Sequence, residues 1–330
     1  MNFFGEAKAL VKANIRDYGM YIALIFIMLT FTIMTNGLFM SSRNISNLLD
    51  SAGYIAVLAV GMTLVIVIRH IDLSVGFLAG FLGAIAAIFL TQMGVSVWIT
   101  IPAILILGAL IGLVNGVLIA KIGIPAFVAT LAGMLIFRGA LLQVTEKTGT
   151  IIIKDDQFNA IGNGFIPSIM QINGLHLLTL LVGLIGILLF VYNEISTRRN
   201  KMTYGFEVMS NGLFSVKLVL ISAIIGYITW ILAGYNGLSW TVIIMIIVVV
   251  IYHFLTTKTV LGRHIYAVGS NPEAAHLSGI NVQKITYIVF GSMGMLAALS
   301  GILFTSRLQS ATTTAGTLFE LDAIAAAYVG

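Results

Sequence analysis

The dominant feature of the sequence is a series of long apolar stretches separated by shorter polar ones. Nine stretches approach or exceed the roughly 20 residues that a helix needs to cross a bilayer. In lipid each span must satisfy its own backbone hydrogen bonds, which a helix does internally. The pattern predicts an all-α, polytopic transmembrane helix bundle of about nine complete spans: Tyr18 to Thr35, Leu48 to Ile68, Ser74 to Thr91, Val97 to Ala120, Ile124 to Val144, Leu175 to Tyr192, Val216 to Tyr235, Leu238 to Leu255, and Ile285 to Phe304.

The composition supports a membrane protein and excludes sites that depend on cysteine. Hydrophobic residues make up 59% of the chain and charged residues only 9%, whereas about a quarter of a soluble domain is charged. The net charge of +5 comes from cations scattered between apolar runs, which argues against nucleic-acid binding. The chain has no cysteine, so disulfides, thiolate metal sites and a catalytic thiol are excluded.

Lys and Arg are distributed unequally between the two sets of loops, which predicts the orientation. One side of the bundle would hold Lys8, Lys12, Arg16, Arg69, Lys121, Arg198, Arg199, Lys201, Lys217, Lys258, Arg263 and Lys284, and the other side only Arg43, Arg138, Lys147, Lys154 and Arg307. The more basic side is expected to be cytoplasmic. We therefore expect a cytoplasmic N-terminus and place the polar stretch from Thr145 to Gly174 outside.

The end of the chain resembles the beginning of a further span. Glu320 and Asp322 precede only a short apolar run, Ala323 to Gly330, which as a helix would be about 12 Å long. That length is far below the thickness of the hydrocarbon core. We therefore expect a single transmembrane domain over residues 1–330 whose sequence is truncated at its C-terminus.

The most informative polar stretch is the segment from Thr259 to Lys284, between two predicted spans. Within it, Ser270 or Asn271 can cap a helix, Pro272 suits the first helical position, and Glu273 complements the positive end of the helix dipole. Gly279 can terminate the helix. The pattern predicts a helix of about two turns outside the membrane, either as a contact for a soluble partner or as a mere cover of the bundle.

Four separated motifs resemble the permease subunits of monosaccharide ABC importers of the ribose, xylose and multiple-monosaccharide type. The motifs are Ile71 to Gly76 (IDLSVG), Gly112 to Lys121 (GLVNGVLIAK), Pro125 to Gly139 (PAFVATLAGMLIFRG), and Gly262 to Ile280 with its continuation through Ala297, Ser300, Gly301, Thr314 to Gly316 and Glu320 to Ile324. They are spread over most of the chain and follow the family's order.

This resemblance implies a set of partners and a location. A second permease copy, an ABC-type ATPase subunit and an extracytoplasmic sugar-binding protein would assemble with the chain in the bacterial cytoplasmic (inner) membrane. The docking loop, residues 259–284, would contact the ATPase through Arg263, Asn271, Glu273, Ala274, Ala275 and Gly279. The sequence has no G-x-x-x-x-G-K-[ST] phosphate loop, so the chain would be a non-catalytic subunit without a cofactor or metal.

Two features depart from the shorter members of that family. Residues 197–257 add two predicted spans, a feature that resembles the longer xylose-like and multiple-monosaccharide permeases. In addition, Arg69 and His70 stand where many relatives have glycines, which puts local flexibility at that point in doubt.

Polar residues at predicted membrane depth are candidates for the substrate path, because ionisable groups there are costly and tend to line aqueous routes. The candidates are Asp72, Ser74, Asn115, Glu320 and Asp322. Asp72 could instead pair with Arg69 or cap the third span, and the two C-terminal carboxylates could instead cap a helix or pair with Arg307.

Other functions remain open at this point. The alternatives are a branched-chain amino-acid ABC permease and an ion-coupled secondary transporter, which would need no ATPase. We see no convincing inverted repeat of the kind that secondary transporters often contain. An intramembrane enzyme lacks a candidate catalytic set in the sequence.

Overall fold

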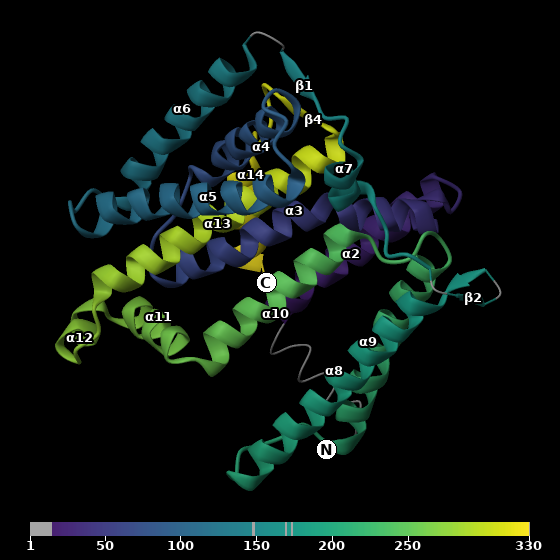
Figure 1. Cartoon of the computed structure of the whole chain (residues 1–330). Coiled ribbons are helices and arrows are strands. Elements are labelled where there is room, and N and C mark those ends of the chain that lie inside the picture. The colour runs from purple at the N-terminus through teal and green to yellow at the C-terminus, as the bar shows by residue number, and fades with distance from the viewer. Residues whose placement is uncertain (1–14, 147–148, 169, 173, 330) are drawn as a thin grey trace. The chain divides into compact units, whose positions relative to one another are not determined.

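The computed structural model describes residues 15–146, 149–168, 170–172 and 174–329. Each of the nine predicted spans corresponds to a helix: α2 (Ile15–Met34), α3 (Ser42–Val67), α4 (Val75–Thr91), α5 (Val97–Ala120), α6 (Ala126–Thr145), α8 (Leu177–Thr203), α9 (Asn211–Ala233), α10 (Trp240–Lys258) and α13 (Val282–Leu308) (Figure 1). Lys8, Lys12 and Lys147, used above to predict the orientation, lie outside the described residues.

The predicted fold class is confirmed, although the number of spans is not fixed. In the described part of the chain, seven of these helices are long and apolar enough to cross a membrane, while Gly19–Met34 and Val75–Thr91 are shorter apolar helices. The other helices in the described part of the chain are short: η1 (Leu38–Met40), α7 (Asp156–Asn163), α11 (Val260–Ser270), α12 (Pro272–Leu277) and α14 (Phe319–Val329). Helix α14 has 11 residues, too few to span a bilayer.

The only described strands form two small antiparallel pairs. Strand β1 (Thr150–Ile152) pairs with β4 (Ser310–Thr312), with Thr150 opposite Thr312. Strand β2 (Gln171–Ile172) pairs with β3 (Leu175–His176). Because β4 directly follows α13, the first pair attaches the loop after α6 to the end of that helix.

The chain folds as two compact units, so the single domain expected from the sequence has an internal division. One unit comprises residues 1–48 and 166–238, and the other comprises residues 49–165 and 239–330. The two extra spans predicted within residues 197–257 are α9, in the first unit, and α10, in the second.

Helix α13 forms the centre of the larger unit and packs against α5 and α4 (Figure 1). Its side chains Phe290, Met293 and Ala297 are fully buried. The contact with α5 depends on glycine: a Cβ on Gly294 would collide with the carbonyl of Gly108, and one on Gly112 with the carbonyl of Phe290. Small residues let helix backbones approach closely in this way, and Gly108, Gly112 and Gly116, which recur four residues apart in α5, all lie on this surface.

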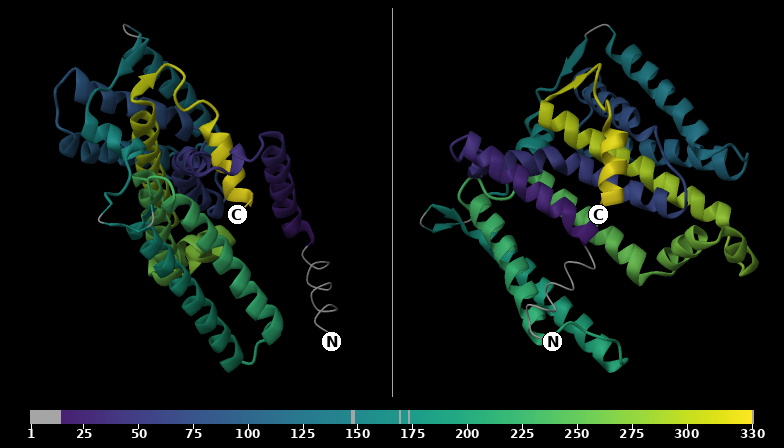
Figure 2. Two further views of the ribbon diagram at one scale, coloured as in Figure 1. Left: turned by 90° about the vertical axis from the view of Figure 1, so that its right-hand side faces the viewer. Right: turned by 180° about the vertical axis from the view of Figure 1, so that it is seen from behind.

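The smaller unit contains the antiparallel hairpin of α8 and α9, which run side by side (Figure 2). Gly183 on α8 faces Thr229 on α9, again leaving no room for a Cβ. Near the turn, Lys217 Nζ lies 2.8 Å from Glu194 Oε2. Large apolar side chains face outward on α8, with Leu188 and Leu189 about three-fifths exposed, which is the surface that lipid would cover.

Candidate functional site

Helix α12 is the two-turn helix predicted from the sequence, and its caps are those that the residues suggested. Of the two capping candidates, Asn271 is the N-cap, and its Oδ1 accepts a hydrogen bond of 3.0 Å from the backbone N–H of Ala274. Pro272 opens the helix and Glu273 lies in its first turn. Gly279 has a φ of 85°, a conformation that favours glycine after a helix end.

The sequence did not predict α11, the 11-residue helix that precedes α12. Its N-cap is Thr259, whose hydroxyl accepts a hydrogen bond from the N–H of Gly262. Ile265 and Val268 are buried, whereas Arg263 and Tyr266 are exposed. The segment from Thr259 to Lys284 is therefore a pair of consecutive helices with one face against the unit's own core and the other open.

Most of the predicted docking residues lie on the open face of this pair. Asn271, Glu273, Ala274 and Gly279 are exposed, as is Arg263. Ala275 differs, because it is only 5% exposed and belongs to the buried core. The expectation that both Ala274 and Ala275 contact the ATPase therefore needs correction: Ala274 faces outward, whereas Ala275 packs α12 against its own unit.

The structure adds a residue that sequence reasoning missed at this surface. Leu277, in the last turn of α12, is 87% exposed. Shallow hollows flank it, one lined by Pro272, Glu273, His276 and Val282 as well as by Leu277 itself, and the other by residues 279–283 with His276. Leu277 thus adds an exposed apolar side chain to the surface formed by the predicted docking residues, and no local pattern in the sequence indicates which face of α12 it occupies.

Arg69 does not pair with Asp72, contrary to one alternative drawn from the sequence. Its φ of 66° shows that the chain leaves the helical conformation there, so the i, i+3 geometry needed for that pair is lost. Its guanidinium instead reaches α11: Nε donates a hydrogen bond of 2.6 Å to the Gly269 carbonyl, and Nη2 donates to the Ser270 carbonyl.

Asp72, Ser74 and Asn115 form a buried polar cluster at the start of α4. The Oδ1 atom of Asp72 accepts hydrogen bonds from the backbone N–H of Ser74 at 2.9 Å and from its hydroxyl at 2.6 Å. The Nδ2 group of Asn115 on α5 donates to Ser74 Oγ at 3.2 Å. All three side chains are nearly inaccessible to solvent.

This cluster bears on the two roles considered for Asp72 from the sequence. Asp72 accepts the Ser74 N–H in the turn before α4, whereas the N-cap of α4 is Ser74 itself, which makes no side-chain cap bond. Asp72 therefore orders the turn before α4 and is not the cap of that helix. Through Ser74, the same carboxylate belongs to a polar contact between α4 and α5 in an otherwise apolar region.

The two C-terminal carboxylates, Glu320 and Asp322, lie in different environments. Glu320 is 6% exposed and lies where a Cβ on Gly76 would stand. Among the described residues its Oε2 atom has no hydrogen-bond partner. Asp322 is exposed. The predicted alternative that these residues pair with Arg307 is wrong, because the ion pair of Arg307 is with Asp50, at 3.5 Å.

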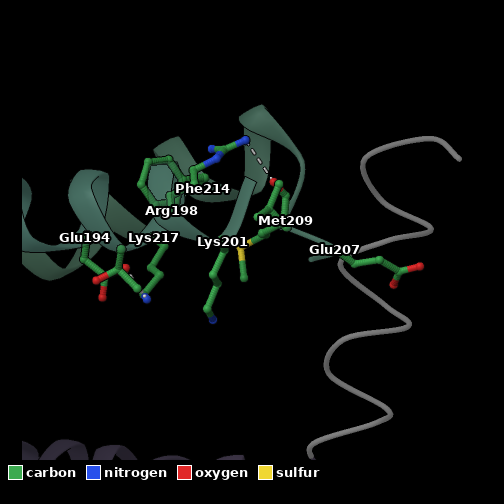
Figure 3. A pocket seen from close by; sticks show the side chains of 9 residues that line it. Glu194, Arg198, Lys201, Glu207, Met209, Phe214 and Lys217 are labelled. Atoms are coloured by element: carbon green, nitrogen blue, oxygen red, sulfur yellow. Dashed lines mark hydrogen bonds and ion pairs between the residues drawn. The ribbon is translucent and has the colours of Figure 1, made fainter. Parts of the chain in front are cut away.

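A mixed-charge hollow lies at the turn between α8 and α9 (Figure 3). Arg198 stands over the ring of Phe214, 4.4 Å from its centroid, and donates to the Met209 carbonyl at 3.0 Å. Lys217 is paired with Glu194 beside it. These contacts hold the turn together. Within the described residues no group of three or more His, Cys, Asp or Glu side chains is arranged to hold a metal ion.

The fold and its outward apolar surface define a multi-pass α-helical membrane protein. Residues 44–330 match the family model described as branched-chain amino acid transport system / permease component. The chain belongs to this permease family.

Curated relatives specify the comparison further. The chain is 36% identical over 326 residues to the xylose transport system permease protein XylH of Escherichia coli K12, covering 99% of this chain and 81% of that one. The Haemophilus influenzae XylH is 37% identical, covering 97% and 83%, and the ribose import permease protein RbsC of H. influenzae is 34% identical, covering 94% and 75%. No solved structure matches. The resemblance to monosaccharide importer permeases is thereby confirmed.

Proposed function

We propose that this chain is the membrane-spanning permease subunit of an ABC importer that carries a xylose-like pentose or a hexose into the cytoplasm. The observation that carries the proposal is similarity to xylose permeases along almost the whole chain. The branched-chain amino-acid alternative is supported only by the name of the family model. The relatives named above are sugar permeases, which favours the carbohydrate branch.

The proposed orientation places α11 and α12 on the cytoplasmic side, together with the N-terminus, in a bacterial inner membrane. The excess of Lys and Arg in one set of loops supports it. In this orientation the α6–α8 loop, with β1 and α7, lies outside, where an extracytoplasmic sugar-binding protein delivers the substrate.

ATP hydrolysis is assigned to a separate subunit, since the chain has no phosphate loop. The ATPase contacts α12 through Glu273, Ala274 and Leu277, with Arg263 and Asn271 beside them. A capped helix whose inner residue Ala275 is packed against the core is rigid enough to transmit a movement. Two copies of the chain form the translocation path, and the permease performs no covalent chemistry.

The sugar path is proposed to run beside the start of α4. Asp72, Ser74 and Asn115 supply hydrogen-bonding groups there, and Glu320 lies near Gly76 with one carboxyl oxygen unpartnered among the described residues. Buried polar groups at membrane depth are usually functional because they are costly. The exposed Asp322 is left out of this path.

Uptake in cells tests the substrate. A strain deleted for this gene is supplied with radiolabelled pentoses and hexoses, with and without the gene on a plasmid. Restored uptake of one monosaccharide supports the proposal, whereas restored uptake of leucine or valine with no sugar uptake would establish the branched-chain alternative.

A further inference from the structure

The side chain of Arg69 joins two segments that are distant in sequence. It extends from the loop after α3 and donates to the carbonyls of Gly269 and Ser270, at the C-terminal end of α11. Carbonyls at a helix end lack intrahelical partners and carry the negative end of the helix dipole. A guanidinium is the side chain best suited to them, because its fixed fork of donors is always charged.

One side of this contact leads directly to α12. Ser270 is followed by Asn271, the N-cap of α12, so the guanidinium holds the peptide group at which α11 ends and α12 begins. The backbones are also packed tightly here, since a Cβ on Gly269 would collide with the carbonyl of Val67 at the end of α3. A displacement of α12 therefore acts on Arg69 without an intervening flexible linker.

The other side of the contact leads to the buried polar cluster. Arg69 is three residues before Asp72, whose carboxylate fixes Ser74 at the start of α4. Ser74 in turn accepts a hydrogen bond from Asn115 on α5. The Thr130 hydroxyl on α6 lies 3.3 Å from the Ile71 carbonyl and 2.9 Å from the Ala126 carbonyl of its own helix, which is the nearer acceptor. The stretch from residue 68 to 74 is thus bonded to α11 at one end and to α4 and α5 at the other, where it also touches α6.

We infer that Arg69 is a positioning residue that couples movement of α12 to the start of α4 and its polar cluster. This inference rests on the proposed function, in which α12 is moved by an ATPase. Without the two guanidinium hydrogen bonds, the ATPase would still bind the permease and hydrolyse ATP. The resulting movement of α12 would, however, displace the start of α4 less.

The test uses the full transporter in proteoliposomes, with its ATPase subunit and binding protein, and measures sugar moved per ATP hydrolysed. Arg69→Gln should retain the ATPase at wild-type yield, yet lower that ratio about tenfold, the factor that a lost charge-assisted hydrogen bond commonly represents. Arg69→Lys keeps the charge without the fork and should give an intermediate ratio. The control is Arg199→Gln, because the exposed Arg199 side chain makes no hydrogen bond or ion pair within the described residues.

A wild-type ratio in the Arg69 variants would overturn the inference. So would loss of the ATPase from purified Arg69→Gln, since Arg69 would then only maintain the shape of the docking surface. If Arg69→Gln does not insert stably, Arg69→Lys alone decides, by a lowered or an unchanged ratio. Failure of the proposed function is distinguishable, because the wild-type chain would then retain no ATPase and would show no ATP-dependent transport.

Discussion

Asp50 and Arg307 form an ion pair that joins α3 to the end of α13, with Arg307 Nη1 3.5 Å from Asp50 Oδ2. The same carboxylate accepts a hydrogen bond from the hydroxyl of Ser239, the N-cap of α10. The Asp50 side chain is only 5% exposed and that of Arg307 22%. The start of α10 and the end of α13 therefore meet at one buried carboxylate of α3.

Asp50→Asn should destabilise the protein markedly. It preserves the shape and an acceptor for Ser239 but removes the charge opposite Arg307, and breaking a buried pair in this way costs about 3 kcal/mol. The control is Glu194→Gln, which breaks the more exposed pair with Lys217 and should cost less than about 1 kcal/mol. Thermal unfolding in nanodiscs measures both, and equal losses for the two variants would contradict the structural role of Asp50.

Gly294→Ala should also destabilise the protein, because the added methyl group meets the Gly108 carbonyl where α13 packs on α5. Overpacking of this kind costs about 1–3 kcal/mol. Gly139→Ala in α6 is the matched control, since a Cβ there meets nothing within 4 Å. It should leave the unfolding temperature unchanged or raise it slightly, because alanine favours helix. Equal unfolding temperatures for the two variants would show that the α5–α13 seam tolerates a wider spacing.

Leu277→Ser should weaken retention of the ATPase without affecting membrane insertion, because Leu277 is 87% exposed on α12. Glu273→Lys should do the same by reversing a charge on this surface. Met93→Ser serves as the control: Met93 is 62% exposed in the loop after α4, on the side proposed to face outward. Affinity purification of the tagged permease checks this, and full recovery of the ATPase with Leu277→Ser and Glu273→Lys would remove α12 from the interface.

Much of the architecture follows from local sequence signals. Runs of apolar residues predicted each long helix, and the glycines spaced four apart in α5 are a local signal for a close helix contact, although they do not indicate that α13 is the partner. The cap of α12 was predictable because Asn271, Pro272 and Gly279 act through their own backbone neighbourhood. Such interactions are encoded within a few residues.

The links between distant segments could not be predicted in the same way. Arg69 reaches Gly269, and Asp50 reaches Ser239 and Arg307, because helix packing brings these positions together. From sequence alone, Asp72 was one possible partner of Arg69, and the carboxylates after Arg307 were possible partners of that residue. Neither pairing forms, because proximity in the chain does not decide contacts that the tertiary fold determines. Ala275, expected at the docking surface, is instead buried, and Leu277, for which the sequence suggested no role, is exposed, since only the packing of α12 determines which side faces outward.

The most direct test of this account is sugar transport by purified components. Proteoliposomes containing this chain are loaded with ATP, and uptake of radiolabelled xylose and of a hexose is measured with and without the ATPase subunit and the sugar-binding protein. The account predicts uptake of one of these sugars only when all components and ATP are present. Full uptake by the chain alone, driven by an ion gradient, would contradict it and establish a secondary transporter.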